Sequence, residues 1–105
     1  MDEPTYNALV DRAFSRIAKA LDAQDPDEVE VDTGGGYLTL TFADRSRCVI
    51  STQRPVREIW MAADATAWHF SGTPDGRWVA GKTGEELMAT VQALVSRKVG
   101  RVVEV

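Results

Sequence analysis

Apolar residues recur at three- and four-residue steps in the first part of the chain. From Tyr6 to Leu21 they form a single stripe, and polar residues fall on the opposite side. This spacing is typical of an amphipathic helix that packs one face on a core. Asp2 can cap the helix and Pro4 suits its first turn. The pattern therefore predicts a helix over residues 3–21.

The apolar residues then recur at every second position, in short runs separated by turn residues. Leu38, Leu40 and Phe42, for example, fall on one side of an extended chain, which is typical of a half-buried strand. Glycine, proline and the Asp75-Gly76 pair end the runs and predict tight turns between them. The predicted strands are Glu28–Asp32, Tyr37–Phe42, Arg47–Gln53, Arg57–Ala62, Trp68–Phe70 and Arg77–Ala80.

A second helical pattern follows over residues 84–98. Thr83 and Glu86 have the spacing of a capping box, and Gly100 favours a stop. The short connections predict antiparallel neighbours, and two helices on one face would leave the other face open. We therefore expect a single α+β domain over residues 1–105. It should be a two-layer α-β sandwich with two helices on one face of a five- to six-stranded antiparallel sheet.

Charge is distributed unevenly along this chain of net charge −4. Residues 1–32 carry nine acids and three bases, whereas residues 33–105 carry seven acids and nine bases. The acidic balance argues against nucleic acid as the main partner. No apolar run is long enough for a membrane span, and no signal segment starts the chain. One cysteine permits no internal disulfide, so we expect a cytoplasmic protein.

Six carboxylates lie within residues 21–32, a stretch that contains no lysine, arginine or histidine. On the predicted strand, Glu28, Glu30 and Asp32 would share one face at about 6–7 Å spacing. Two such charges repel by roughly 0.6 kcal/mol in water. Residue pattern alone leaves two interpretations: a solvated edge that deters strand aggregation, or a surface for a cation or a basic partner.

The segment from Gly76 to Thr83 matches the phosphate-loop pattern G-x-x-x-x-G-K-[ST]. Its middle residues read as a strand, although a phosphate loop must leave its backbone N–H groups free. Glu85 and Glu86 would also place negative charge where phosphates must bind. We therefore interpret the match as accidental.

Residues suited to catalysis are few. His69 and Cys48 are the only His and Cys, and neither has a partner placed beside it by sequence. The set excludes a structural zinc site, so any metal ligands would be oxygen atoms that hold a hard cation loosely. Strand parity places Trp60 outward, on the open sheet face, where it is either partly covered by its neighbours or an exposed anchor for a protein partner.

Several segments in order resemble the frataxin family in its bacterial, CyaY-like form. The most specific is Ile50-Ser-Thr-Gln53-x-Pro55 followed by Ile59-Trp60. The other segments that carry the resemblance are the acidic stretch, Gly35 to Phe42, Trp68-His69-Phe70 and Arg77-Trp78-Val79. The resemblance covers nearly the whole chain and implies the same sandwich fold.

The resemblance implies a non-enzymatic, iron-binding protein of iron–sulfur cluster assembly. Such a protein regulates the cysteine desulfurase, supplies iron, or does both, and it also binds the scaffold protein. It would be a monomer that can form oligomers with iron. Weakly bound ferrous or ferric iron would lie on an acidic ridge, here Asp22, Asp25, Asp27, Glu28, Glu30 and Asp32. The partner-binding residues would be Ser51, Gln53, Glu58, Trp60 and His69.

Two departures from the family pattern matter. Ser51 stands where the family usually has Asn, and Lys19 and Ala20 stand where bacterial members often have acids. The ridge is thus thinner on its helix side. Two other functions stay open: a metal-independent interaction module that uses the open sheet face, and, ranked lower, an iron oxidase.

Overall fold

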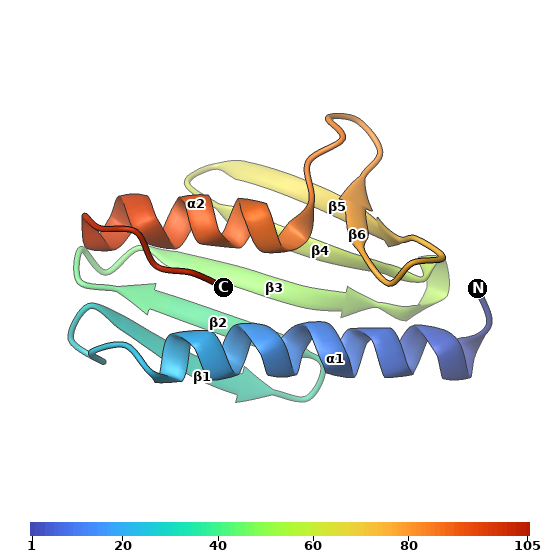
Figure 1. The fold of residues 1–105 in the computed structure, drawn as a ribbon, viewed down its shortest axis with the longest axis horizontal. Helices are drawn as coiled ribbons and strands as arrows, with labels where there is room; N and C mark the ends of the chain where they lie inside the picture. Colours follow the sequence, from blue (N-terminus) through green and yellow to red (C-terminus); the bar gives the residue numbers. More distant parts are fainter.

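A computed structural model describes all 105 residues of the protein (Figure 1). The chain runs from a long helix through six strands to a second helix. The elements are α1 (Glu3–Asp22), β1 (Val29–Gly34), β2 (Tyr37–Phe42), β3 (Arg47–Gln53), the 3-10 turn η1 (Arg54–Val56), β4 (Glu58–Ala63), β5 (Thr66–Gly72), β6 (Trp78–Ala80) and α2 (Leu87–Val99). No helix is long and apolar enough to cross a membrane.

The strands form one antiparallel sheet in sequence order, β1 to β6. Both helices lie on the same face of this sheet, α1 over the β1 side and α2 nearer β6 (Figure 1). This arrangement confirms the predicted two-layer sandwich and leaves the other sheet face open. Short turns impose the order, since each two- to five-residue connection can only join antiparallel neighbours.

The core lies between the sheet and the two helices. Alternate strand residues such as Leu40, Ile50 and Ile59 are fully buried, and they meet the apolar stripe of α1 at Ile17. Tyr6 is also buried, and its hydroxyl donates a hydrogen bond to the Glu58 carbonyl at 2.7 Å. The period-two and period-3.6 patterns therefore placed the core correctly.

The C-terminal tail, residues 101–105, packs back between the helices (Figure 1). Val103 is 3% exposed, and its backbone N–H donates to the Ser96 hydroxyl at 3.0 Å. The Gln92 side chain accepts from Val105 N, and Arg16 donates to the Val105 carbonyl. The tail thereby joins α1 to α2.

The capping box predicted for α2 is wrong. The helix begins at Leu87, and Glu86 is itself the cap, because its carboxylate accepts from the backbone N–H groups of Met88 and Ala89. Thr83 instead accepts a hydrogen bond from Glu85 N within the preceding turn. Gly84 has a φ of +76°, which a helical residue cannot adopt and which delays the helix start.

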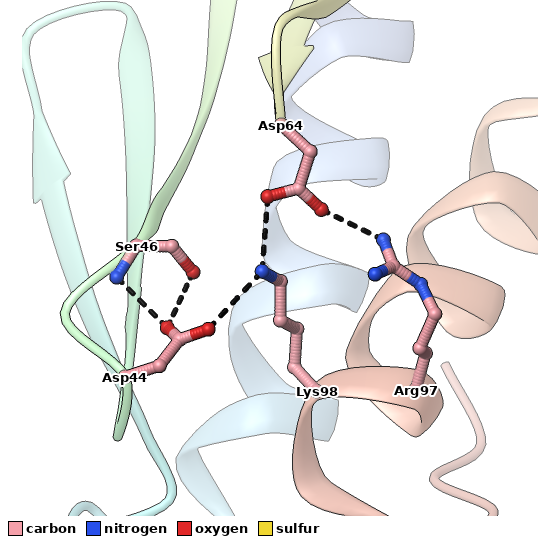
Figure 2. A network of polar contacts seen from close by, with 5 residues as sticks. All are labelled: Asp44, Ser46, Asp64, Arg97 and Lys98. Atoms are coloured by element: carbon pink, nitrogen blue, oxygen red, sulfur yellow. Dashed lines mark hydrogen bonds and ion pairs between the residues drawn. The ribbon is translucent and has the colours of Figure 1, made fainter.

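Two turns of the sheet are tied to the end of α2 by a small ionic network (Figure 2). Lys98 donates to Asp64 at 2.9 Å and to Asp44 at 3.3 Å, and Arg97 donates to Asp64 at 2.7 Å. Ser46 donates to Asp44 through both its backbone N–H and its hydroxyl. These bonds to Ser46, with the Lys98 contact, lower the pKa of Asp44 to about 2. Arg97 and Lys98 likewise lower the pKa of Asp64.

This network predicts a specific loss of stability in acid. The folded pKa of Asp44 lies below its usual value of 3.8. Its contribution is therefore complete above about pH 4 and is lost as pH falls toward about 2. We expect the melting temperature of D44N/D64N to be lower than wild type at pH 7, and the difference to shrink toward pH 2. Melting curves recorded from pH 7 to pH 2 check this, with D11N as an exposed control. Parallel curves for wild type and D44N/D64N would contradict it.

Candidate functional site

The predicted ridge residues lie along the connection from α1 to β1 and on β1 itself. Asp22 ends α1, while Asp25 and Asp27 lie in the connection, and all three are exposed. Glu30 and Asp32 lie on β1 and point to the open sheet face, opposite Thr41 and Thr39. The structure thus gathers the ridge at one edge of the molecule.

Asp25 shapes the bend that brings the helix into the strand. Its carbonyl accepts from Glu28 N at 2.9 Å and from Val29 N at 3.1 Å. Its carboxylate accepts from Asp27 N at 2.9 Å, which is an Asx turn. One carboxylate oxygen of Asp25 therefore has a structural role, and the other remains available for a ligand.

Glu28 does not share a strand face with Glu30 and Asp32, contrary to the sequence prediction. β1 begins one residue later, at Val29, and Glu28 pairs instead with Arg101 at 2.5 Å. Arg101 also donates to the Gln24 side chain at 2.9 Å, and its pKa is raised mainly by the hydrogen bond to Glu28. Arg101 lies 73 residues from Glu28 in the sequence, so no local pattern could indicate this contact.

The ridge is a set of separated carboxylates and not a cage. No three Asp, Glu, His or Cys side chains come together in an arrangement that could hold a metal ion. Each carboxylate can offer one or two oxygen ligands, and water would complete the coordination of a hard cation. Ligands arranged in this way would form weak, adaptable sites.

Arg101 offsets part of the ridge charge, and its removal should strengthen cation binding. A unit charge about 7 Å from a bound divalent cation repels it by about 1.2 kcal/mol in water, a factor of roughly seven in affinity. We expect R101Q to bind ferrous iron about sevenfold more tightly than wild type in an anaerobic titration. K82Q removes one positive charge from an exposed residue elsewhere and is the control. Equal affinities for R101Q and K82Q would contradict the assignment.

The five predicted partner-binding residues come together on the open sheet face. Ser51, Trp60 and His69 are paired across β3, β4 and β5 in one row. The rings of Trp60 and His69 are stacked, with centroids 4.1 Å apart and planes 9° from parallel. Gln53 and Glu58 form the adjacent row. These five residues are called the sheet-face patch below.

Hydrogen bonds fix the side chains of the sheet-face patch. Trp60 Nε1 donates to a Glu58 carboxylate oxygen at 2.9 Å, and the Ser71 hydroxyl donates to the other oxygen at 3.3 Å. Gln53 donates to the Ser51 hydroxyl at 3.3 Å. Trp60 is half-buried and held on two sides, so it presents a fixed apolar surface to solvent. Little conformational entropy would be lost when a partner covers it.

Two exposed apolar residues extend the sheet-face patch toward the ridge. Tyr37 is 47% exposed and Val49 is 38% exposed, and both point to the open face. Strand parity places them outward, but their contribution to a site was not predicted. Tyr37 pairs with Ser51, and Val49 pairs with Thr39, which lies opposite Asp32. The sheet-face patch and the strand half of the ridge thus form one continuous surface.

The apparent phosphate loop is not a phosphate site in the structure. Its middle residues Trp78–Ala80 are β6, and they pair with β5. Glu86 occupies the free N–H groups at the start of α2. Cys48 is fully buried, and burial raises its pKa to about 12, so the thiol is a core residue.

Comparison with known proteins gives a consistent result. Residues 1–101 match the frataxin-like domain family. An iron–sulfur cluster assembly protein CyaY of Vibrio cholerae is 38% identical over 92 residues, covering 88% of this chain and 86% of that protein. The CyaY of a Shewanella species is 38% identical over 104 residues, covering 95% of this chain and 94% of that protein.

Solved structures show the same fold. A frataxin from Psychromonas ingrahamii superposes with a TM-score of 0.89 at 22% identity, covering 99% of this chain and 97% of that one. A trimeric yeast frataxin complexed with ferrous iron superposes with a TM-score of 0.67 at 22% identity, covering 96% and 89%.

Proposed function

We propose that this chain, which belongs to the frataxin family, acts in iron–sulfur cluster assembly. It would bind ferrous or ferric iron weakly on the acidic ridge and regulate the cysteine desulfurase machinery, supply it with iron, or do both. The relatives at 38% identity are named iron–sulfur cluster assembly proteins, and a yeast frataxin was solved with ferrous iron. Both observations support the proposal.

The observation that carries the proposal is the continuous surface that joins the ridge to the sheet-face patch. Glu30 and Asp32 are exposed at one edge of the open face, and the half-buried Trp60 lies near its centre. A partner with basic residues and an apolar contact site would complement both. The cysteine desulfurase and the scaffold protein are the proposed partners.

This surface suggests how iron could regulate the partner. A cation and a basic partner segment would both use the ridge carboxylates, so the binding of one changes the affinity for the other. Because the cation sites are open and weak, their occupancy would follow the available iron concentration. Binding to the folded state would also raise the melting temperature by mass action.

A second candidate is a metal-independent interaction module. The stacked and hydrogen-bonded Trp60 favours it, since a fixed aromatic ring is a common anchor of protein interfaces. In this case the ridge would serve as a purely electrostatic contact. An iron oxidase ranks lower, because that chemistry favours a preformed set of Glu and His ligands around the metal.

Affinity for the desulfurase, measured with and without iron, separates these functions. In anaerobic buffer, titrations would be run with a chelator and with saturating ferrous iron. The regulatory proposal predicts a change in Kd of at least about fivefold between the two conditions. Equal Kd values would favour the metal-independent module. No binding in either condition would contradict both.

A further inference from the structure

One buried polar atom has no hydrogen-bond partner in the protein. Trp78 is 2% exposed, and its indole Nε1 is the single buried side-chain nitrogen or oxygen left unpaired. The other two Trp residues both donate to carboxylates, Trp60 to Glu58 and Trp68 to Glu85. An unpaired buried donor is unfavourable, and it indicates an acceptor that the polypeptide does not supply.

Trp78 lines a small cavity between α1, the β5–β6 turn and the start of α2. The cavity has a volume of about 80 Å³. The far corner of the indole, Cζ3, lies beside Gly72. The indole nitrogen is at the opposite end of the ring system from Cζ3, so it faces away from Gly72.

The cavity is rich in positive charge. Arg12, Arg16 and Arg77 line it, and Glu86 is the single acid among its lining residues. Glu86 is already engaged as the cap of α2, and Arg77 pairs with Asp75. Arg12 takes part in no ion pair, and Arg16 makes one hydrogen bond, to the Val105 carbonyl. Arg12 and Arg16 are exposed and lie one helical turn apart, so their like charges repel, and an anion between them would relieve this repulsion.

We propose that this cavity binds a small oxyanion, a phosphate or carboxylate group, held by Arg12, Arg16 and the indole N–H of Trp78. Guanidinium groups match the paired oxygens of such anions, and a charged acceptor makes the stronger hydrogen bond to the indole. The site lies on the helix side of the sheet, away from the ridge and the sheet-face patch. The anion would hold α1 against the β5–β6 turn and would stabilise the fold.

Indole N–H resonances of ¹⁵N-labelled protein test the site, with inorganic phosphate as the probe. Ionic strength would be held constant with sodium chloride, and sodium acetate would be titrated separately. The Trp78 N–H signal should shift and saturate with phosphate or acetate, while the signals of Trp60 and Trp68 stay in place. The melting temperature should rise over the same concentration range.

Paired surface variants keep the test independent of folding. R12Q/R16Q should weaken phosphate binding at least about tenfold, because both charged donors are lost. K19Q/K82Q removes the same charge from positions outside the cavity and should bind as wild type does. A Trp78 signal that ignores both anions would show that water alone fills the cavity and would overturn the proposal. So would equal shifts of all three indole signals, or unchanged binding by R12Q/R16Q.

Discussion

Replacing four ridge carboxylates by their amides is expected to weaken ferrous iron binding by at least about tenfold. The variant is D25N/D27N/E30Q/D32N. Each carboxylate supplies one or two oxygen ligands to a loosely held cation, and each also lowers the local potential. The D25N change should keep the turn that Asp25 forms, because an amide oxygen can still accept the hydrogen bond from the backbone N–H of residue 27. The loss can therefore be assigned to charge and not to misfolding.

The same variant should melt at a higher temperature than wild type. Glu30 and Asp32 are two residues apart on one strand face, and charges at about 6–7 Å repel by about 0.6 kcal/mol in water. Anaerobic iron titration and thermal melting measure the two effects. A matched control neutralises four exposed carboxylates elsewhere: Glu3, Asp11, Glu85 and Glu104. If this control loses iron affinity as strongly, the ridge has no special role.

Trp60→Ala should weaken binding to the desulfurase by about 2 kcal/mol, or roughly thirtyfold in Kd, as for aromatic anchors at other interfaces. The folded state should lose about 1 kcal/mol, chiefly the stacking on His69. A large loss of binding with a small loss of stability is the expected signature, since Trp60 points away from the core. Isothermal titration and chemical unfolding give the two numbers.

Two further variants sharpen the Trp60 prediction. Trp60→Phe keeps a ring over His69 but removes the hydrogen bond to Glu58, so its affinity should lie between those of wild type and W60A. Val56→Ala removes apolar surface from a residue that is 56% exposed in η1 and should bind normally. Wild-type affinity for W60A would exclude the sheet-face patch as the partner surface.

The sequence alone was sufficient to predict which residues form the core, because strand alternation and helical spacing depend on local residues. β2 and β3 have the predicted bounds, and the α1 stripe is buried as expected. The row of Ser51, Trp60 and His69 also followed from strand parity once the strands were antiparallel neighbours. Their role in partner binding remains a prediction.

Two kinds of feature were not predicted from the sequence. In one, the same local sequence can form either of two structures. The other depends on contacts between residues that are far apart in the sequence. T-x-x-E can form a capping box, but Glu86 can also cap by itself, and Gly84 favours the second arrangement. The alternating pattern placed Glu28 on the strand face, but in the structure Glu28 forms an ion pair with Arg101. The unpaired nitrogen of Trp78 is visible only when the surroundings of the ring are known.

Amide spectra recorded during an anaerobic titration with ferrous iron test the central proposal most directly. Paramagnetic iron broadens signals near its binding site, so the first amides to weaken report its position. We predict that residues 22–32 weaken first, at less than one equivalent of iron, while the amides around Trp78 and the start of α2 are unaffected. Broadening that starts elsewhere, or none at an excess of iron, would contradict an iron site on the acidic ridge.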